Sequence, residues 1–80
     1  MINVIFYTKE NCPLCENALA LLKLLQQDYS FDIDTRDIYS NDNWLEKYQL
    51  LIPYVKIGAV ELDCEQINLA TLEDAIKMAN

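Results

Sequence analysis

Two cysteines three positions apart, Cys12 and Cys15, stand between a short apolar run and a long leucine-rich segment. The run at residues 2–7 is rich in β-branched and aromatic side chains, which predicts a buried strand. Pro13 suits the first turn of a helix, where the N–H that proline lacks has no helical partner anyway. The pattern therefore places both thiols where a strand ends and a helix begins.

This junction gives the two thiols different environments. Cys12 falls at the helix N-terminus, where unpaired N–H groups and the helix dipole favour a negative charge. The thiolate is the reactive form of cysteine, so a pKa lowered in this way makes Cys12 the expected nucleophile. Cys15 lies about one turn further on, within reach of Cys12 for a disulfide. We expect a redox-active pair, with Cys12 the more exposed thiol and Cys15 the more buried.

Two other interpretations of the pair remain open. Cys-x-x-Cys is also half of a zinc site, but zinc takes four ligands, usually Cys or His. The chain has three Cys and no His, so a complete site would need Cys64 with a carboxylate, or a second chain. The other alternative is two ordinary buried cysteines at a helix start. The proline between the thiols and Lys9 upstream favour redox chemistry, and no metal site is expected.

Composition predicts a single small domain over residues 1–80. The chain is 52% hydrophobic with one Gly and two Pro, unlike a linker or a disordered segment. No stretch approaches the roughly 20 apolar residues that span a bilayer, and strand residues begin at Ile2 without a basic leader. We therefore expect a cytoplasmic protein. The net charge of −7 disfavours nucleic-acid and membrane partners, and we interpret this acidity mainly as solubility.

Hydrophobic periodicity predicts the remaining elements. Alternation over residues 31–36 indicates a half-buried strand, and residues 44–51 a short helix. Residues 54–57 and 60–62 form two strands around a two-residue turn that starts at Gly58. A helix over 69–79 ends the chain. The first helix is expected to bury an apolar stripe at helical spacing: Leu14, Ala18, Leu21, Leu22 and Leu25. Three residues of the second helix are expected to be core or groove-wall residues: Trp44, Tyr48 and Leu51.

The predicted order is β-α-β-α-β-β-α, an α/β fold with a four-stranded mixed sheet flanked by three helices. The first two strands enclose a helix and are expected to be parallel with a right-handed crossover. The last two strands form an antiparallel hairpin.

The motifs in this order resemble the glutaredoxin-like family of small thioredoxin-fold proteins, in a Cys-Pro-Leu-Cys variant. Residues 8–15 are similar to the glutaredoxin segment Thr-Lys-x-x-Cys-Pro-Tyr-Cys, with Leu14 in place of the tyrosine. Small glutaredoxin-like proteins with Cys-x-Leu-Cys-Glu are closer still. Their Val-Asp-Ile, Tyr and Ile-Pro-Val correspond here to residues 36–38, Tyr48 and residues 52–55. The resemblance spans essentially the whole chain and implies the thioredoxin fold in its minimal glutaredoxin form.

The resemblance also implies a thiol-disulfide oxidoreductase. Cys12 would attack a substrate disulfide, Cys15 would resolve the mixed disulfide, and Lys9 would stabilise the Cys12 thiolate by its charge. No bound cofactor is needed, because an external thiol reductant, either glutathione or a protein, would recharge the dithiol. The expected partners are a disulfide-containing protein and a reductase, acting on a monomer.

Substrate contacts are implied at four positions: Pro13, Leu14, Ile52 and Pro53. The resemblance makes the Ile52–Pro53 bond cis, which only an X–Pro bond adopts at low cost, and aims the Ile52 backbone at an extended substrate. Two other functions remain open. One is a binding module that uses this edge without redox turnover. The other is metal or iron–sulfur binding through Cys12 in a dimer.

Asp63 and Cys64 depart from the family pattern. Glutaredoxins usually carry Gly-Gly at this point, where the backbone approaches glutathione, and only glycine combines positive φ with no side chain. Asp63 adds a negative charge near an expected glutathione carboxylate. We therefore expect weak glutathione dependence. Cys64 is either a space-filling residue or a secondary thiol that forms mixed disulfides under oxidation.

Overall fold

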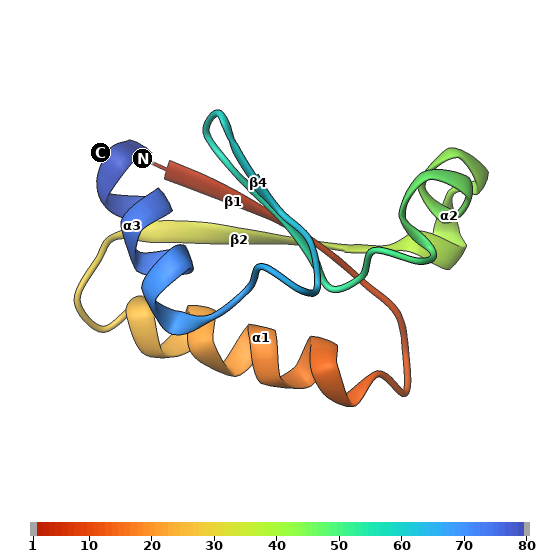
Figure 1. Ribbon diagram of the computed structural model, residues 1–80, viewed down its shortest axis with the longest axis horizontal. Coiled ribbons are helices and arrows are strands. Elements are labelled where there is room, and N and C mark those ends of the chain that lie inside the picture. Colours follow the sequence, from red (N-terminus) through yellow and green to blue (C-terminus); the bar gives the residue numbers. More distant parts are fainter. Residues whose placement is uncertain (1, 80) are drawn as a thin grey trace.

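The computed structural model describes residues 2–79 as one four-stranded sheet with three α-helices packed against it (Figure 1). In chain order the elements are β1 (Ile2–Thr8), α1 (Pro13–Leu25), β2 (Phe31–Asp37), the 3-10 helix η1 (Ile38–Ser40), α2 (Asp42–Tyr48), β3 (Tyr54–Ile57), β4 (Val60–Leu62) and α3 (Leu69–Ala79). This is the predicted order with η1 added. Within the described residues, no helix is both long and apolar enough to cross a bilayer.

The sheet has the strand order β2-β1-β3-β4 and is mixed, as predicted. β1 pairs with β2 in parallel, with Ile2 opposite Phe31, because the intervening helix returns the chain to the same end of the sheet. β3 runs antiparallel to both β1 and β4. Ile57 lies opposite Val60, so a two-residue turn joins β3 and β4, and its first residue, Gly58, has φ +58. Glycine adopts this left-handed conformation without steric cost.

The two faces of the sheet carry two separate apolar clusters. Val4 and Phe6 of β1 point into the larger cluster, which α1 and α3 cover. Tyr7 points to the opposite face, where it packs with Ile38 and Tyr48 in a smaller cluster beneath α2. In Figure 1, α2 lies at the end of the sheet away from the two termini, and α1 begins at that same end. The turn before α1 and the segment around α2 therefore share one end of the molecule.

Helix α1 corrects one prediction. Leu14 does not pack in the core, because its side chain is 62% exposed, and Leu21 is only half-buried. The buried face starts one residue later and is equally helical in spacing: Cys15, Ala18, Leu22 and Leu25. Since both registers satisfy the period, the leucines alone did not decide which one faces inward. Cys15, rather than Leu14, begins the buried stripe.

Helix α2 begins and ends earlier than predicted. Asn41 caps it, because its Oδ1 accepts hydrogen bonds from two backbone N–H groups of the first turn at 2.9 and 3.2 Å. The helix ends at Tyr48, so Leu51 lies in a following turn, where its N–H donates to the Tyr48 carbonyl at 2.8 Å. Leu51 is nevertheless half-buried against the smaller cluster.

Candidate active site

The turn between β1 and α1 sets the position of Cys12. Asn11 has φ +55, a left-handed conformation that asparagine tolerates better than most residues because its short polar side chain can bond locally. The chain then passes into an extended Cys12, with φ −121 and ψ 97, followed by Pro13 at the start of the helix. Cys12 is therefore the N-cap of α1, as the sequence predicted.

Cys12 and Cys15 form a disulfide with their Cα atoms 5.2 Å apart. The Cys12 carbonyl accepts the first helical hydrogen bond from the N–H of Glu16 at 3.0 Å. The Sγ of Cys12 accepts a hydrogen bond from the N–H of Cys15 at 3.2 Å. The sulfur thus occupies the position that a capping oxygen takes at other helices. After reduction, the same N–H and the helix dipole would face a Cys12 thiolate.

Both cysteines are buried, Cys15 more deeply than Cys12. Cys12 is 8% exposed and Cys15 is 2% exposed, so the order is the predicted one, although both side chains count as buried in this disulfide form. Both belong to the larger apolar cluster. Among residues 2–79, no group of three or more Cys, Asp or Glu side chains is placed to hold a metal ion.

The segment before β3 packs against the same cluster as the disulfide. The Ile52–Pro53 bond is cis, as the family resemblance implied, and Pro53 is buried while Ile52 is half-buried. Ile52 contacts the cluster that contains both cysteines. Its N–H donates to the Tyr48 carbonyl at 3.1 Å. The Ile52 N–H is therefore engaged within the protein.

The connection after β4 lies beside this segment. The Cys64 N–H donates to the Leu51 carbonyl at 3.0 Å, which ties the connection to the residue before Ile52. Cys64 itself is a half-buried free thiol. The Asp63 carboxylate accepts hydrogen bonds from the N–H groups of Glu65 and Gln66 at 2.9 and 3.2 Å.

The backbone here differs from the glycine-dependent conformation that the family comparison suggested. Within residues 2–79, positive φ occurs only at Asn11 and Gly58, so neither Asp63 nor Cys64 has it. The departure from Gly-Gly therefore lies in side-chain volume and in the charge of Asp63.

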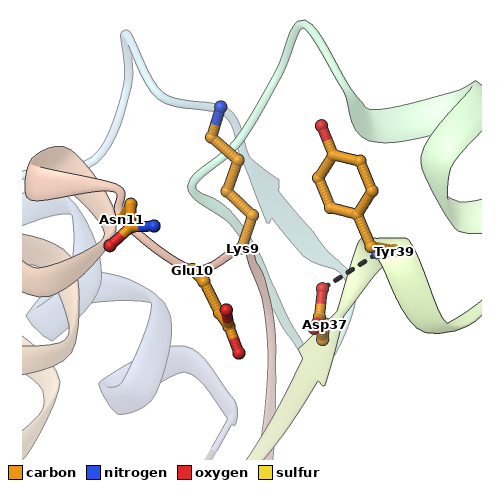
Figure 2. Close-up of a pocket in the computed structure, with 5 residues that line it drawn as sticks. All are labelled: Lys9, Glu10, Asn11, Asp37 and Tyr39. Atoms are coloured by element: carbon orange, nitrogen blue, oxygen red, sulfur yellow. Dashed lines mark hydrogen bonds between the residues drawn. The ribbon is translucent and has the colours of Figure 1, made fainter.

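A pocket of about 410 Å³ lies next to the Cys12 turn (Figure 2). Five residues line it: Lys9, Glu10, Asn11, Asp37 and Tyr39. Lys9 extends along Tyr39, and the two polar tips lie on the same side of the view. The structure thus places Lys9 in the same turn as Cys12 but orients it along this pocket. Sequence reasoning missed Asp37 and Tyr39 as pocket residues, since strand alternation gives no sign that the chain turns toward the dithiol after β2.

Aromatic side chains fill the face under α2. Tyr7 stacks on Tyr48 with ring centroids 4.1 Å apart, and Trp44 meets Tyr7 edge-on at 5.8 Å. The Arg36 guanidinium lies 5.3 Å from the centre of the Trp44 ring and donates to the Tyr7 hydroxyl at 3.3 Å. These contacts identify Trp44 and Tyr48 as packing residues, in agreement with their helical spacing.

Two tyrosines on this face have shifted pKa values. Burial raises the pKa of Tyr48, but the Lys56 ammonium and the Tyr7 hydroxyl outweigh burial, so that the pKa is lowered from its ordinary value. Tyr54 donates a hydrogen bond to Glu61 at 2.7 Å. That bond, together with burial, raises the pKa of Tyr54 to about 12.

The match to a known family is nearly as long as the chain. A profile of the glutaredoxin-like domain family (DUF836) matches residues 3–77. The chain belongs to this family. The Cys12–Cys15 pair of this glutaredoxin-like domain lies inside the matched range. No curated protein matches the chain.

Solved structures share the thioredoxin-like fold of this glutaredoxin-like domain. A malarial protein superposes with a TM-score of 0.73 at 16% identity, over 99% of this chain and 97% of its own. Oxidised mitochondrial thioredoxin 3 from Saccharomyces cerevisiae gives a TM-score of 0.73 at 19% identity, over 96% of this chain and 77% of its own. Glutaredoxin from Brucella melitensis gives a TM-score of 0.58 at 27% identity, over 98% of this chain and 85% of its own. The fold is therefore the predicted thioredoxin-like α/β fold.

Proposed function

We propose that this glutaredoxin-like domain is a thiol-disulfide oxidoreductase. The observation that carries the proposal is the Cys12–Cys15 disulfide at the N-terminus of α1, with the Cys12 sulfur accepting the Cys15 N–H. A sulfur in this place is stabilised as a thiolate, which is both the attacking form of cysteine and a good leaving group. The same pair that closes in the folded protein can therefore open and close as a two-electron couple.

The cycle has two displacements. The Cys12 thiolate attacks one sulfur of the substrate disulfide, a Cys12–substrate bond forms, and the other substrate sulfur leaves as a thiolate that takes a proton from water. The Cys15 thiolate then attacks the Cys12 sulfur and releases the second substrate thiol. The substrate disulfide gains two electrons, and the dithiol loses two. An external thiol reductant returns them.

Other residues of the proposed site bind rather than react. Lys9 brings a positive charge to the turn that carries Cys12, where it favours the thiolate. Leu14 is 62% exposed beside the disulfide and offers apolar contact to a bound chain, together with exposed Pro13. The Ile52 carbonyl and Pro53 are the other contacts that we assign to the substrate; Ile52 packs on the cluster that holds the cysteines, and Pro53 is buried.

The test traps the intermediate. A Cys15→Ser/Cys64→Ser variant is mixed with a disulfide-linked peptide and analysed by mass spectrometry, with Cys12→Ser/Cys64→Ser as the matched control. We expect a stable peptide adduct on Cys12 in the first variant and none in the second, because resolution needs Cys15. Peptide that binds without forming an adduct would overturn the proposal in favour of a binding module. A cluster absorption in the protein as isolated would favour metal binding through Cys12.

A further inference from the structure

The pocket beside Cys12 is not used by the proposed cycle. Lys9, Glu10 and Asn11 come from the turn that leads directly into Cys12, while Asp37 ends β2 and Tyr39 lies in η1 (Figure 2). Because Asn11 precedes Cys12 in the chain, a substrate joined to Cys12 places its neighbouring residues close to this pocket. The pocket is thus positioned to contact the substrate next to the reacting sulfur.

The pocket carries two carboxylates that no cation within the described residues neutralises. Across residues 2–79 the ion pairs within 4.0 Å are Arg36–Asp34 and Lys56–Glu61, and neither involves the pocket. Lys9 lines the pocket, yet its ammonium lies apart from the carboxylates of Glu10 and Asp37 (Figure 2). The pocket therefore has an acidic part that remains available to a ligand.

One of the two carboxylates, that of Asp37, is held in place. Asp37 Oδ1 accepts a hydrogen bond from the N–H of Tyr39 at 2.9 Å, which fixes the carboxylate at the start of η1. The Tyr39 side chain itself is 64% exposed, an unusually open position for a large aromatic residue. A pocket lined by an exposed ring and two carboxylates suits a lysine or arginine side chain, whose stem packs on apolar surface and whose charged head reaches a carboxylate.

We propose that this pocket selects disulfide substrates in which a lysine or arginine lies next to the reacting cysteine. The inference rests on the proposed function and names the class of protein substrate that the same site prefers. The basic side chain enters the pocket, and its charge meets the carboxylates of Glu10 and Asp37. The acidity of the chain, which sequence analysis assigned mainly to solubility, then also serves recognition.

The experiment compares three disulfide-linked peptides that differ only in the residue beside the cysteine, which is Lys, Gln or Glu. Single-turnover rates of reduction by the reduced protein are divided by the rates with dithiothreitol, because a neighbouring charge also changes the reactivity of the peptide sulfur. We expect the normalised rate to be roughly three- to tenfold higher for the Lys than for the Glu peptide at low salt, and the ratio to shrink as salt screens the charges.

The matched variant is Glu10→Gln/Asp37→Asn, which removes both charges and keeps an acceptor for the Tyr39 N–H. The control is Asp28→Asn/Asp32→Asn, which removes the same net charge at exposed positions near the other end of the sheet. We expect the ratio of the Lys-peptide rate to the Glu-peptide rate to fall to about one in the pocket variant and to stay high in the control. Tyr39→Ala is expected to lower the same ratio, but less than the double carboxylate variant does.

The outcomes separate the two proposals. Equal normalised rates for the three peptides, or a preference for the Glu peptide through Lys9, would overturn the pocket assignment and leave the oxidoreductase intact. Equal loss of preference in the pocket and control variants would also overturn it, because net charge alone would then explain the effect. Failure to reduce any of the peptides would overturn the proposed function and the pocket assignment together.

Discussion

At Cys12 a single sulfur atom serves both structure and chemistry. It caps α1 by accepting the Cys15 N–H at 3.2 Å, and it is the atom that the proposed cycle requires as a thiolate. One neighbour is expected to act against that thiolate. Glu16 lies in the first turn of α1, where its N–H bonds to the Cys12 carbonyl, so its negative charge sits one turn from the sulfur. We therefore expect the reactivity of Cys12 to balance the helix terminus against a nearby carboxylate.

Removing the Glu16 charge is expected to make Cys12 reactive at lower pH. In a Cys15→Ser/Cys64→Ser background Cys12 is the only thiol of the chain. The midpoint of the pH dependence of its alkylation rate should fall on Glu16→Gln, because removing a nearby negative charge favours the thiolate. Asp28→Asn, beyond the far end of α1, should leave the midpoint in place. A midpoint that stays fixed in Glu16→Gln would show that the carboxylate does not act on the sulfur.

The ordinary pKa of a tyrosine is about 10, and Tyr54 is expected to ionise at a higher pH than this. Its bond to Glu61 raises its pKa to about 12, so the folded state holds this proton more tightly than the unfolded state. The resulting stabilisation is complete below about pH 10 and is lost as the pH rises through about 12. Tyrosinate absorbance should therefore show a late component that Tyr54→Phe removes and Glu61→Gln moves to lower pH. A late component unchanged in Tyr54→Phe would assign it to another residue.

At the level of elements, strand alternation and turn chemistry were decisive where only one arrangement fitted. Gly58 between two short apolar runs predicted the β3–β4 hairpin, and Pro13 after Cys12 predicted the start of α1; both are as expected. The periodicity was ambiguous where two registers fitted the helical spacing equally well. Leu14 and Cys15 both continue a helical stripe, and only packing on the sheet selects Cys15. The end of α2 also depended on tertiary contacts that the sequence pattern does not encode.

The hairpin turn depends on the backbone conformation of Gly58 rather than on space around it. A Cβ added there would meet the Cβ of Ala79 at 3.5 Å, an ordinary contact, but φ is +58. Gly58→Ala is therefore expected to lower the free energy of unfolding by about 1–2 kcal/mol through backbone strain. Denaturant unfolding measures the change. Unchanged stability would mean that the turn rearranges when a side chain is added.

Helix α2 is expected to depend on Trp44 for its attachment to the sheet. Trp44 is half-buried against Tyr7 and the Arg36 guanidinium, so Trp44→Ala should cost about 2 kcal/mol of unfolding free energy. Tyr39→Ala, an equally aromatic but exposed position, should change stability by no more than about 0.5 kcal/mol. Unfolding followed by circular dichroism checks both. Lost activity with unchanged stability in Trp44→Ala would assign this residue to binding instead.

For the whole molecule, the charge distribution bears on which reductant recharges the dithiol. The net charge is −7, and Asp63 lies in the connection whose N–H at Cys64 bonds to the segment before Pro53. The sequence predicted the fold and the cysteine pair, because these depend on local motifs. It did not predict the ordinary φ of Asp63 and Cys64, because family glycines suggested a conformation that this turn does not use. We therefore expect charge and side-chain volume to be the two obstacles to glutathione.

We expect weak glutathione-dependent turnover in the native chain and faster recharging by a thioredoxin-reductase system. Asp63→Asn removes the charge but keeps an acceptor for the N–H groups of Glu65 and Gln66. Asp63→Gly/Cys64→Gly removes volume as well. Glutathione turnover should rise several-fold in the first variant and further in the second. Robust, saturable turnover in the native chain that neither variant improves would refute this expectation.

The most direct test of the account is a redox titration of Cys12 and Cys15. The Cys64→Ser variant is equilibrated in dithiothreitol buffers of graded potential, and free thiols are counted by a mass-shifting alkylating reagent. We predict that both thiols disappear together in one transition with a slope of about 30 mV per tenfold change in the ratio of oxidised to reduced protein, as a two-electron couple requires. Thiols that oxidise independently, or that stay reduced throughout, would contradict the assignment of a redox-active dithiol.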